Sequence, residues 1–313
     1  MLDIYYGIIS GVIIMKYYLD EVINDNKNDK TLTIEIIGYD EFIVEYSDIH
    51  HIINMQHHLN DVKHCRVDLY NDGYNGIMSI LDKKSLKHYH SFGFCLSDKK
   101  LILIDNEKIV ENLIKQIKAE YYNKHISLSC FLQYLIVKII ENDGLYLQKY
   151  LEKLESIEDQ IDLNFNEKIS KSIMSIRKNL LSISSYYTQL GDMVDIFCDN
   201  ESDFLNSYEC HLFNMLARRI DRLERQVATL RDYSMQIREM YQNKIDMHQN
   251  KVMTLLTVAT SLFFPLSIIT GWYGMNFVYM PELFSKYGYI MVIIASVLII
   301  IIEMIIFKKK KFF

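Results

Sequence analysis

The sequence predicts an α+β domain at the N-terminus, a long helical stalk and two membrane-spanning helices at the C-terminus. Residues 1 to about 120 alternate short β-rich runs with polar turns, and residues 128–251 have a helical pattern without a single proline. Two apolar runs then follow, each 21 residues long, and about 20 such residues cross a bilayer core as a helix. A chain of 313 residues is long enough to bury a sizeable core.

The N-terminal region contains the strand patterns. Ile4–Met15 is apolar but short, and it lacks a basic n-region and a cleavage site, so we expect a buried β-hairpin and no signal peptide. Further strands are expected at Thr31–Ile37, Phe42–Tyr46, Cys65–Tyr70 and Lys100–Ile104, with helices at Ser47–Lys63 and Asn106–Glu120 and turns at Asp72-Gly73 and Asn75-Gly76. These elements predict a mixed or antiparallel sheet. No glycine-rich phosphate loop or nucleophile elbow is present, so we expect no enzyme and no organic cofactor.

The helical region has three expected breaks, at Asp143-Gly144, Asn164–Asn166 and Asp199–Asp203. Its acidic stretch, Glu152–Asp162, is either a solvated helix face or a surface that attracts cations. The last cytoplasmic helix carries a heptad stripe, made of Leu216, Ile220, Leu223, Val227, Leu230, Ser234, Ile237 and Tyr241. Asp203 to Trp272 would form one helix on the order of 105 Å long, which invites parallel bundling with copies of the same chain.

The two apolar runs are Val252–Trp272 and Tyr287–Phe307, and a short polar-aromatic loop connects them. Lys244, Lys251 and Lys308–Lys311 flank the pair on one side, whereas the connecting loop carries only Lys286. Since cytoplasmic flanks carry the excess of lysine, we expect both termini in the cytoplasm and the protein in the cell membrane. Glu303, the one charge in the second run, is expected to reach the inner interface.

One face of the first span is more polar than the rest. Asn250, Met253, Thr257, Thr260, Phe264, Ser267 and Gly271 follow each other at steps of three or four. Polar side chains in lipid favour the interior of a helix bundle, but the hydroxyls can also bond their own backbone carbonyls, and the stripe alone fits both interpretations. Two spans cannot enclose an ion path, so a channel would have to be an oligomer around this helix. Asn276, at the outer mouth, could then present a ring of amides to a hydrated Mg²⁺, which gives up its water reluctantly.

Composition restricts the remaining classes. The net charge of −6 argues against a nucleic-acid partner. Five cysteines without a C-x-x-C pair predict free thiols and no zinc ribbon. His50, His57 and His64 are seven residues apart and form either a solvated helix face or a transition-metal site.

The segment between the spans resembles the signature of the CorA magnesium transporters. The matching residues are Tyr273-Gly274-Met275-Asn276-Phe277, followed by Met280-Pro281-Glu282-Leu283. The threonine-rich first span with Pro265, the entry Lys286–Tyr289 and the tail Lys308–Lys311 are also similar to that family. The likeness extends over essentially the whole chain. It implies an α/β/α sandwich in a funnel-shaped homopentamer, embedded in the bilayer, that conducts Mg²⁺, with Co²⁺ and Ni²⁺ as further ions.

The resemblance also implies roles for individual residues. Tyr273, Gly274, Met275, Asn276 and Glu282 would form the outer selectivity loop, where Asn276 contacts the hydrated ion. Asn250, Met253, Leu256, Thr257, Thr260, Phe264 and Ser267 would line the pore and its hydrophobic gate. The chain then divides into 1–125 (N-terminal domain), 126–202 (cytoplasmic helices), 203–272 (stalk and first span), 273–286 (outer loop), 287–307 (second span) and 308–313 (basic tail).

One departure from the family concerns regulation by cytosolic Mg²⁺. The family's stalk carries an acidic sensor residue, but the corresponding stretch here, Phe213–Leu216, has no carboxylate. Asp203, Glu209 and Asp221 are the nearby alternatives. This departure and the histidine row keep a Zn²⁺ transporter of the ZntB branch open as an alternative. A more distant alternative is a membrane-anchored coiled-coil scaffold that conducts nothing.

Overall fold

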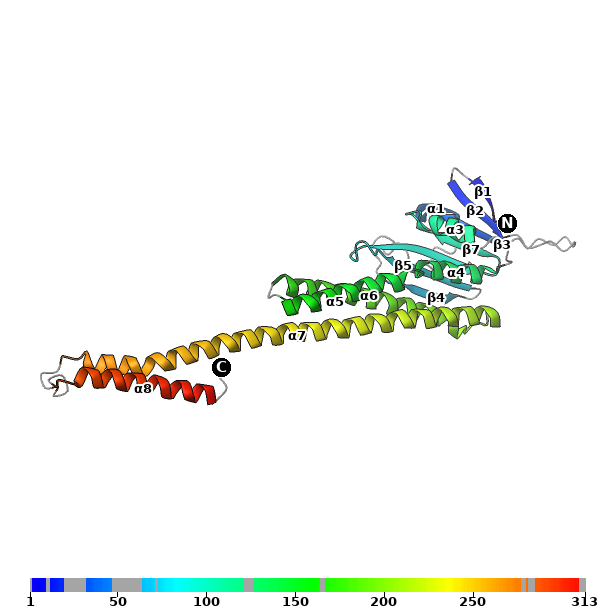
Figure 1. The fold of residues 1–313 in the computed structure, drawn as a ribbon. Coiled ribbons are helices and arrows are strands. Elements are labelled where there is room, and N and C mark those ends of the chain that lie inside the picture. The colour runs from blue at the N-terminus through cyan, green and yellow to red at the C-terminus, as the bar shows by residue number, and fades with distance from the viewer. Residues whose placement is uncertain are drawn as a thin grey trace. The chain divides into compact units, whose positions relative to one another are not determined.

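The computed structural model describes residues 2–9, 12–19, 32–46, 64–70, 73–120, 126–163, 167–276, 280 and 285–309. The chain forms two compact units, residues 1–237 and residues 238–313 (Figure 1). The six segments expected from the sequence are a finer division than these two units and stay a prediction.

The first unit contains a seven-stranded mixed sheet, counted over the described residues. Its strands are β1 (Leu2–Ile9), β2 (Val12–Leu19), β3 (Leu32–Ile37), β4 (Arg66–Tyr70), β5 (Gly73–Leu81), β6 (Tyr89–Ser97) and β7 (Lys100–Ile104). They lie in the order β1-β2-β3-β7-β6-β5-β4, and only β3 and β7 are parallel. The expected N-terminal hairpin is confirmed, because β1 pairs antiparallel with β2. The expected strands around β3, β4 and β7 are confirmed as well.

Helices cover both faces of this sheet, as the α/β/α expectation requires. They are α1 (Tyr39–Glu45), α3 (Ile109–Glu120), α4 (Leu128–Ile139), α5 (Asp143–Leu163), α6 (Glu167–Asp199) and the first part of α7 (Ser207–Tyr273). On one face Phe42 of α1 packs with Ile102 and Ile104 of β7. On the other face Phe94 of β6 lies against Phe197 of α6, which stacks on Phe213 of α7 at 4.6 Å between ring centroids. Because alternate strand residues point to opposite faces, a central strand such as β6 supplies both layers of the core, with Phe94 on one face and Cys95 on the other.

Two predictions for this unit are wrong. Phe42–Tyr46 was expected to be a strand, but α1 begins at Tyr39 and includes Phe42. The helix start is fixed by the Glu41 carboxylate, which accepts the N–H of Gly38 at 3.1 Å, and such a cap satisfies an otherwise orphan donor. The expected helix Ser47–Lys63, with His50 and His57 of the histidine row, lies outside the described residues, whereas His64 is described and exposed.

The second wrong prediction is the turn at Asn75-Gly76. Both residues lie inside β5, where Gly76 pairs with Val67 of β4 and Phe94 of β6. A Cβ at Gly76 would lie 2.5 Å from the carbonyl oxygen of Arg66 and 2.6 Å from the Phe94 ring. This glycine therefore allows close packing across the sheet and does not reverse the chain.

The heptad stripe of α7 is part of the core of the first unit. Leu216, Ile220, Val227 and Ile237 are at most 1% exposed within a single chain. Side chains of α5 and α6 also bond α7. Thr188 Oγ1 of α6 donates to Glu224 at 2.6 Å, Arg231 Nη1 donates to Ser184 of α6 at 3.3 Å, and the Tyr233 hydroxyl donates to Glu158 of α5. The stripe is thus covered by the chain's own helices, so any bundling with other copies must use another face of α7.

The second unit contains the rest of α7 and α8 (Gly288–Lys309). Both helices are long and apolar enough to cross a membrane. Figure 1 draws α8 running back along the last part of α7, as expected for two spans joined by a short loop. The bounds lie within two residues of the expected span ends.

Candidate pore face and outer loop

All seven residues expected to line a pore lie on exposed positions of α7. These are Asn250, Met253, Leu256, Thr257, Thr260, Phe264 and Ser267. The large apolar members are the most informative, since Met253 is 61% and Phe264 68% exposed in the single chain. Neither α8 nor any other described residue covers this side of α7, so it is available to neighbouring copies or to an ion path.

A different face of α7 is covered within the same unit. Val258 is 6% exposed, and Leu262, Pro265 and Ile269 are half-buried. These residues step by four, three and four along the helix, so they share a face. Since α8 is the only other helix among the described residues of this unit, the covering element is α8. The two helices therefore leave the polar stripe outside their own contact, as a pore-lining role for α7 requires.

The hydroxyls of Thr260 in the stripe and of Thr254 beside it bond backbone carbonyls of their own helix, which is one of the two interpretations that the sequence leaves open. Thr260 Oγ1 donates to Leu256 O at 2.9 Å and to Thr257 O at 3.0 Å. Thr254 donates to Asn250 O at 2.8 Å in the same way. A hydroxyl that donates still has lone pairs to accept with. Water around a cation donates hydrogen bonds, so the outward oxygen of Thr260 suits a hydrated ion even though its proton is engaged.

Pro265 lies inside α7, and the helix continues through it to Tyr273. Proline has no N–H, so the carbonyl four residues earlier, at Ser261, loses its helix partner. Ser261 is half-buried on the side of α7 toward α8. The irregularity thus lies beside the contact between the two helices and leaves the exposed stripe continuous.

The end of α7 at Tyr273 explains why a glycine comes next in the sequence. Gly274 N–H donates to Thr270 O at 2.9 Å, and Met275 N–H donates to Trp272 O at 3.3 Å, so the chain turns tightly off the helix. A Cβ at Gly274 would lie 2.9 Å from the Thr270 oxygen, closer than real Cβ contacts allow. Gly274 therefore sets the path of the loop by its lack of a side chain.

Met275 and Asn276 follow this turn at exposed positions, and Met275 is 45% exposed. An exposed amide at the helix end offers an oxygen that accepts and an NH₂ that donates. Trp272, Tyr287 and Tyr289 are exposed near the same end, at the depth where an aromatic belt is expected. Glu282 lies outside the described residues.

The acids considered for a cytosolic sensor differ in their surroundings. Glu209 is buried, and its carboxylate accepts two hydrogen bonds. The N–H of Asn206 donates to it at 2.9 Å, which caps the start of α7, and the Ser127 hydroxyl donates to it at 2.5 Å. Asp221 is exposed near Asp195, and burial together with the charge of Asp221 raises the pKa of the Asp195 carboxyl. Among the described residues no group of three or more His, Cys, Asp or Glu side chains could hold a metal ion.

Glu303 lies in α8, and its Oε2 is buried without a hydrogen-bond partner. The lysines of the same helix, Lys308 and Lys309, follow at five and six residues. Helical side chains meet at spacings of three and four, so neither lysine lies above Glu303. The expectation that this carboxylate reaches the inner interface stays a prediction.

Comparison with known proteins assigns the family. A family model described as "CorA-like Mg2+ transporter protein" matches residues 39–309. The chain belongs to this family. The family's description is that of a transporter and not of an enzyme, and the two membrane-length helices of this CorA-like chain agree with it.

Individual relatives agree with the assignment. The chain is 27% identical over 220 residues to the "Cobalt/magnesium transport protein CorA" of Thermotoga maritima, a match that covers 68% of this chain and 62% of that one. The chain thus matches less than two thirds of that relative's length. The full CorA structure from Methanocaldococcus jannaschii shares the fold with a TM-score of 0.77 and 20% identity, covering 95% of this chain and 98% of that one. The cytoplasmic domain of ZntB from Vibrio parahaemolyticus, at 17% identity and a TM-score of 0.53, covers 69% of this chain and 88% of that domain.

Proposed function

We propose that this CorA-like chain forms a homopentameric channel for divalent cations, with Mg²⁺ as its main ion and Co²⁺ and Ni²⁺ as further ions. The observation that supports this most directly is the polar stripe of α7. Every predicted pore residue is exposed, while α8 covers a different face. The names of the relatives, which refer to magnesium and cobalt transport, support the choice of ions.

The chemistry of the stripe suits an ion that keeps its water. Asn250, Thr257, Thr260 and Ser267 are neutral and carry no charge that would hold a divalent ion tightly. Their oxygens accept hydrogen bonds from a hydration shell without replacing it, which favours Mg²⁺ because this ion dehydrates reluctantly. Asn276 would make the corresponding outer-sphere contacts at the mouth, and Met253, Leu256 and Phe264 would form the hydrophobic constriction that gates by dewetting.

The driving force would be passive. An elementary charge that crosses the membrane gains about 2.3 kcal/mol per 100 mV, and a divalent ion gains about twice that. With the lysine-rich flanks in the cytoplasm, both termini would face the interior of the cell and an inside-negative potential would drive uptake. A regulatory Mg²⁺ site at Phe213–Leu216 is not expected, because this stretch has no carboxylate.

A Zn²⁺ transporter of the ZntB branch is the second candidate. The likeness of the cytoplasmic unit to a ZntB domain favours it, although at 17% identity this likeness concerns the fold alone. A coiled-coil scaffold that conducts nothing is less well supported. The heptad stripe that suggested it is buried within the chain, and a scaffold has no need of an exposed polar face through the membrane.

The test is ion influx into liposomes that contain the purified full-length protein, an internal Mg²⁺-sensitive dye and an inside-negative potential. We expect influx in the wild type and its loss in Asn276→Ala. Asn112→Ala, an exposed asparagine of α3, is the matched control and should conduct normally. Uptake seen only with a Zn²⁺ dye would transfer the assignment to the zinc branch. Equal influx with Asn276→Ala would remove the proposed filter.

A further inference from the structure

The inner end of the second unit combines an aliphatic helix face with lysines. On α8, Ile294, Leu298, Ile301 and Ile305 are 54%, 52%, 47% and 60% exposed. They step by four, three and four, so they form one stripe that faces away from α7. The next steps of three and four lead to Lys308 and Lys309, which are exposed as well.

These lysines lie at the membrane depth where the lipid headgroups begin. Lys309 follows the start of α8 by 21 residues, and Lys251 precedes the end of α7 by 22 residues. At 1.5 Å per residue both lie about 30 Å from the outer turn, which is the thickness of a hydrocarbon core. The aliphatic stripe therefore ends at the inner boundary of the membrane, and three lysines lie at that depth.

The one carboxylate in α8 does not neutralise them. Glu303 is one to two turns deeper than the lysines, and its Oε2 is buried without a hydrogen-bond partner. The nearest acid at the inner end of α7, Asp246, accepts from Gln242 of its own helix at 3.1 Å. The lysine charges thus face the headgroup region, where the opposite charge available in a membrane is a lipid phosphate.

We propose that Lys308 and Lys309 bind the headgroup of an anionic phospholipid of the inner leaflet. The acyl chains of this lipid lie on the stripe Ile294, Leu298, Ile301 and Ile305. The headgroup phosphate accepts from the lysine ammonium groups, and the aliphatic stripe supplies the apolar contact. Because the site needs both parts, a lipid fits it better than a free anion does. The inference does not depend on whether the chain conducts ions.

The experiment is native mass spectrometry of the delipidated full-length protein, titrated with phosphatidylglycerol or with phosphatidylcholine of the same acyl chains. We expect the wild type to retain phosphatidylglycerol preferentially. The double variant Lys308→Gln with Lys309→Gln should lose about fivefold in that preference for each lysine, since a lysine near the surface contributes about 1 kcal/mol to anionic-lipid binding. The double variant with arginine at both positions should keep the preference.

Lys286→Gln is the matched control, because Lys286 is an exposed lysine at the opposite, outer end of the same unit. It should leave the preference unchanged. Equal retention of both lipids by the wild type would overturn the proposal, and so would a preference that survives in the glutamine double variant. Displacement of phosphatidylglycerol by millimolar inorganic phosphate would show that the lysines bind a free anion, which would overturn the assignment to a lipid.

Discussion

The burial of the heptad stripe predicts that a single substitution in it lowers the stability of the chain itself. Leu216 is 1% exposed, and removing a fully buried leucine side chain to alanine costs about 2–5 kcal/mol. Each kcal/mol shifts the melting temperature of a domain of 150–250 residues by about 2–4 °C. We therefore expect Leu216→Ala to lower the first unfolding transition of the detergent-solubilised protein by roughly 4–20 °C.

The neighbouring residue provides a control on the same turn of α7. Met215 is 53% exposed, so Met215→Ala should change the melting temperature by little. Circular dichroism at two protein concentrations, tenfold apart, separates the two explanations of the stripe. An intrachain core gives the same temperature shift at both concentrations. If Leu216→Ala left the melting temperature unchanged and lowered only the oligomer mass, the stripe would be an interface between copies and the assignment of its burial would be wrong.

Three further predictions concern single side chains. Tyr187→Phe removes the 2.8 Å bond that its hydroxyl donates to the buried Asp143, so we expect a loss of about 1–3 kcal/mol in unfolding free energy, measured by urea titration. Thr260→Val removes an outward acceptor oxygen from the exposed stripe and should lower Mg²⁺ influx about two- to tenfold, whereas Thr254→Val, off that stripe, should not. Burial raises the pKa of the Cys95 thiol to about 12, so at pH 8 it stays a thiol and should resist iodoacetamide until the chain is denatured, as peptide mass spectrometry would report.

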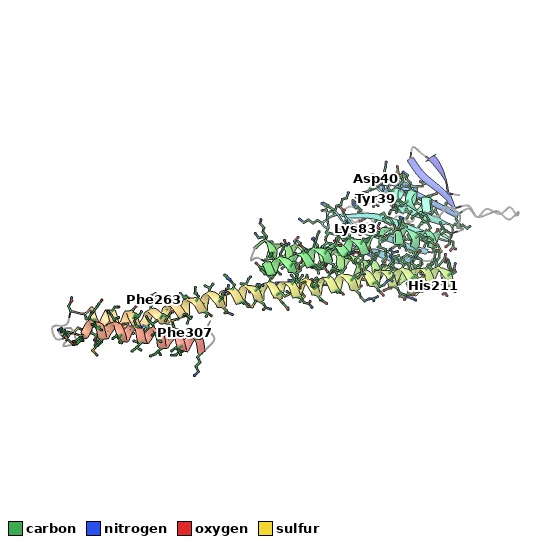
Figure 2. The ribbon with its side chains drawn as sticks, in the orientation of Figure 1. Tyr39, Asp40, Lys83, His211, Phe263 and Phe307 are labelled. Atoms are coloured by element: carbon green, nitrogen blue, oxygen red, sulfur yellow. The ribbon has the colours of Figure 1, made fainter. Side chains whose placement is uncertain are left out.

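The surroundings of Asp143 show how the first unit connects its parts. Asp143 is 1% exposed at the start of α5, and it forms an ion pair with Lys83. Lys83, labelled in Figure 2, comes from the loop between β5 and β6. Tyr187 of α6 donates to the same carboxylate. Burial and this nearby carboxylate raise the pKa of Tyr187, so its hydroxyl remains a donor. A buried carboxylate with two partners thus joins the sheet to two helices.

Long periodic segments could be predicted from the sequence more securely than short ones, two of which were wrong. The breaks at Asp143-Gly144 and Asp199–Asp203 agree with the start of α5 and the end of α6, because a helical pattern over many residues is hard to mistake. The prediction of a strand at Phe42–Tyr46 is wrong because four apolar residues and one glutamate fit a strand as well as a helix, and the cap from Glu41 decides between them. Gly76 was taken for a turn because the close approach of Phe94 across the sheet cannot be seen in local sequence.

In the candidate site too, the sequence pattern shows which residues share a helix face but does not show what that face contacts. The period of the stripe from Asn250 to Ser267 was sufficient to place these residues on one face, which the structure leaves exposed. The heptad pattern of Leu216 to Ile237 was equally regular, yet it could not tell whether the partner helix comes from the same chain or from a copy. Periodicity fixes which residues share a face, whereas the partner of that face depends on α5 and α6, which are distant in sequence.

The hydrogen bonds of Thr260 restrict how the stripe could select an ion. Thr260 donates its only hydroxyl proton to carbonyls one turn back, so toward the open side it can accept but not donate. A dehydrated divalent cation is commonly held by oxygen ligands that include carboxylates, and among the described residues the stripe carries no carboxylate, so even five copies of each oxygen around a pore would supply only neutral ligands. A hydrated cation requires only acceptors for the outward hydrogens of its water. The stripe is therefore better matched to a hexahydrated Mg²⁺ than to a bare ion, and selection by hydration would not need a charged residue anywhere along this face.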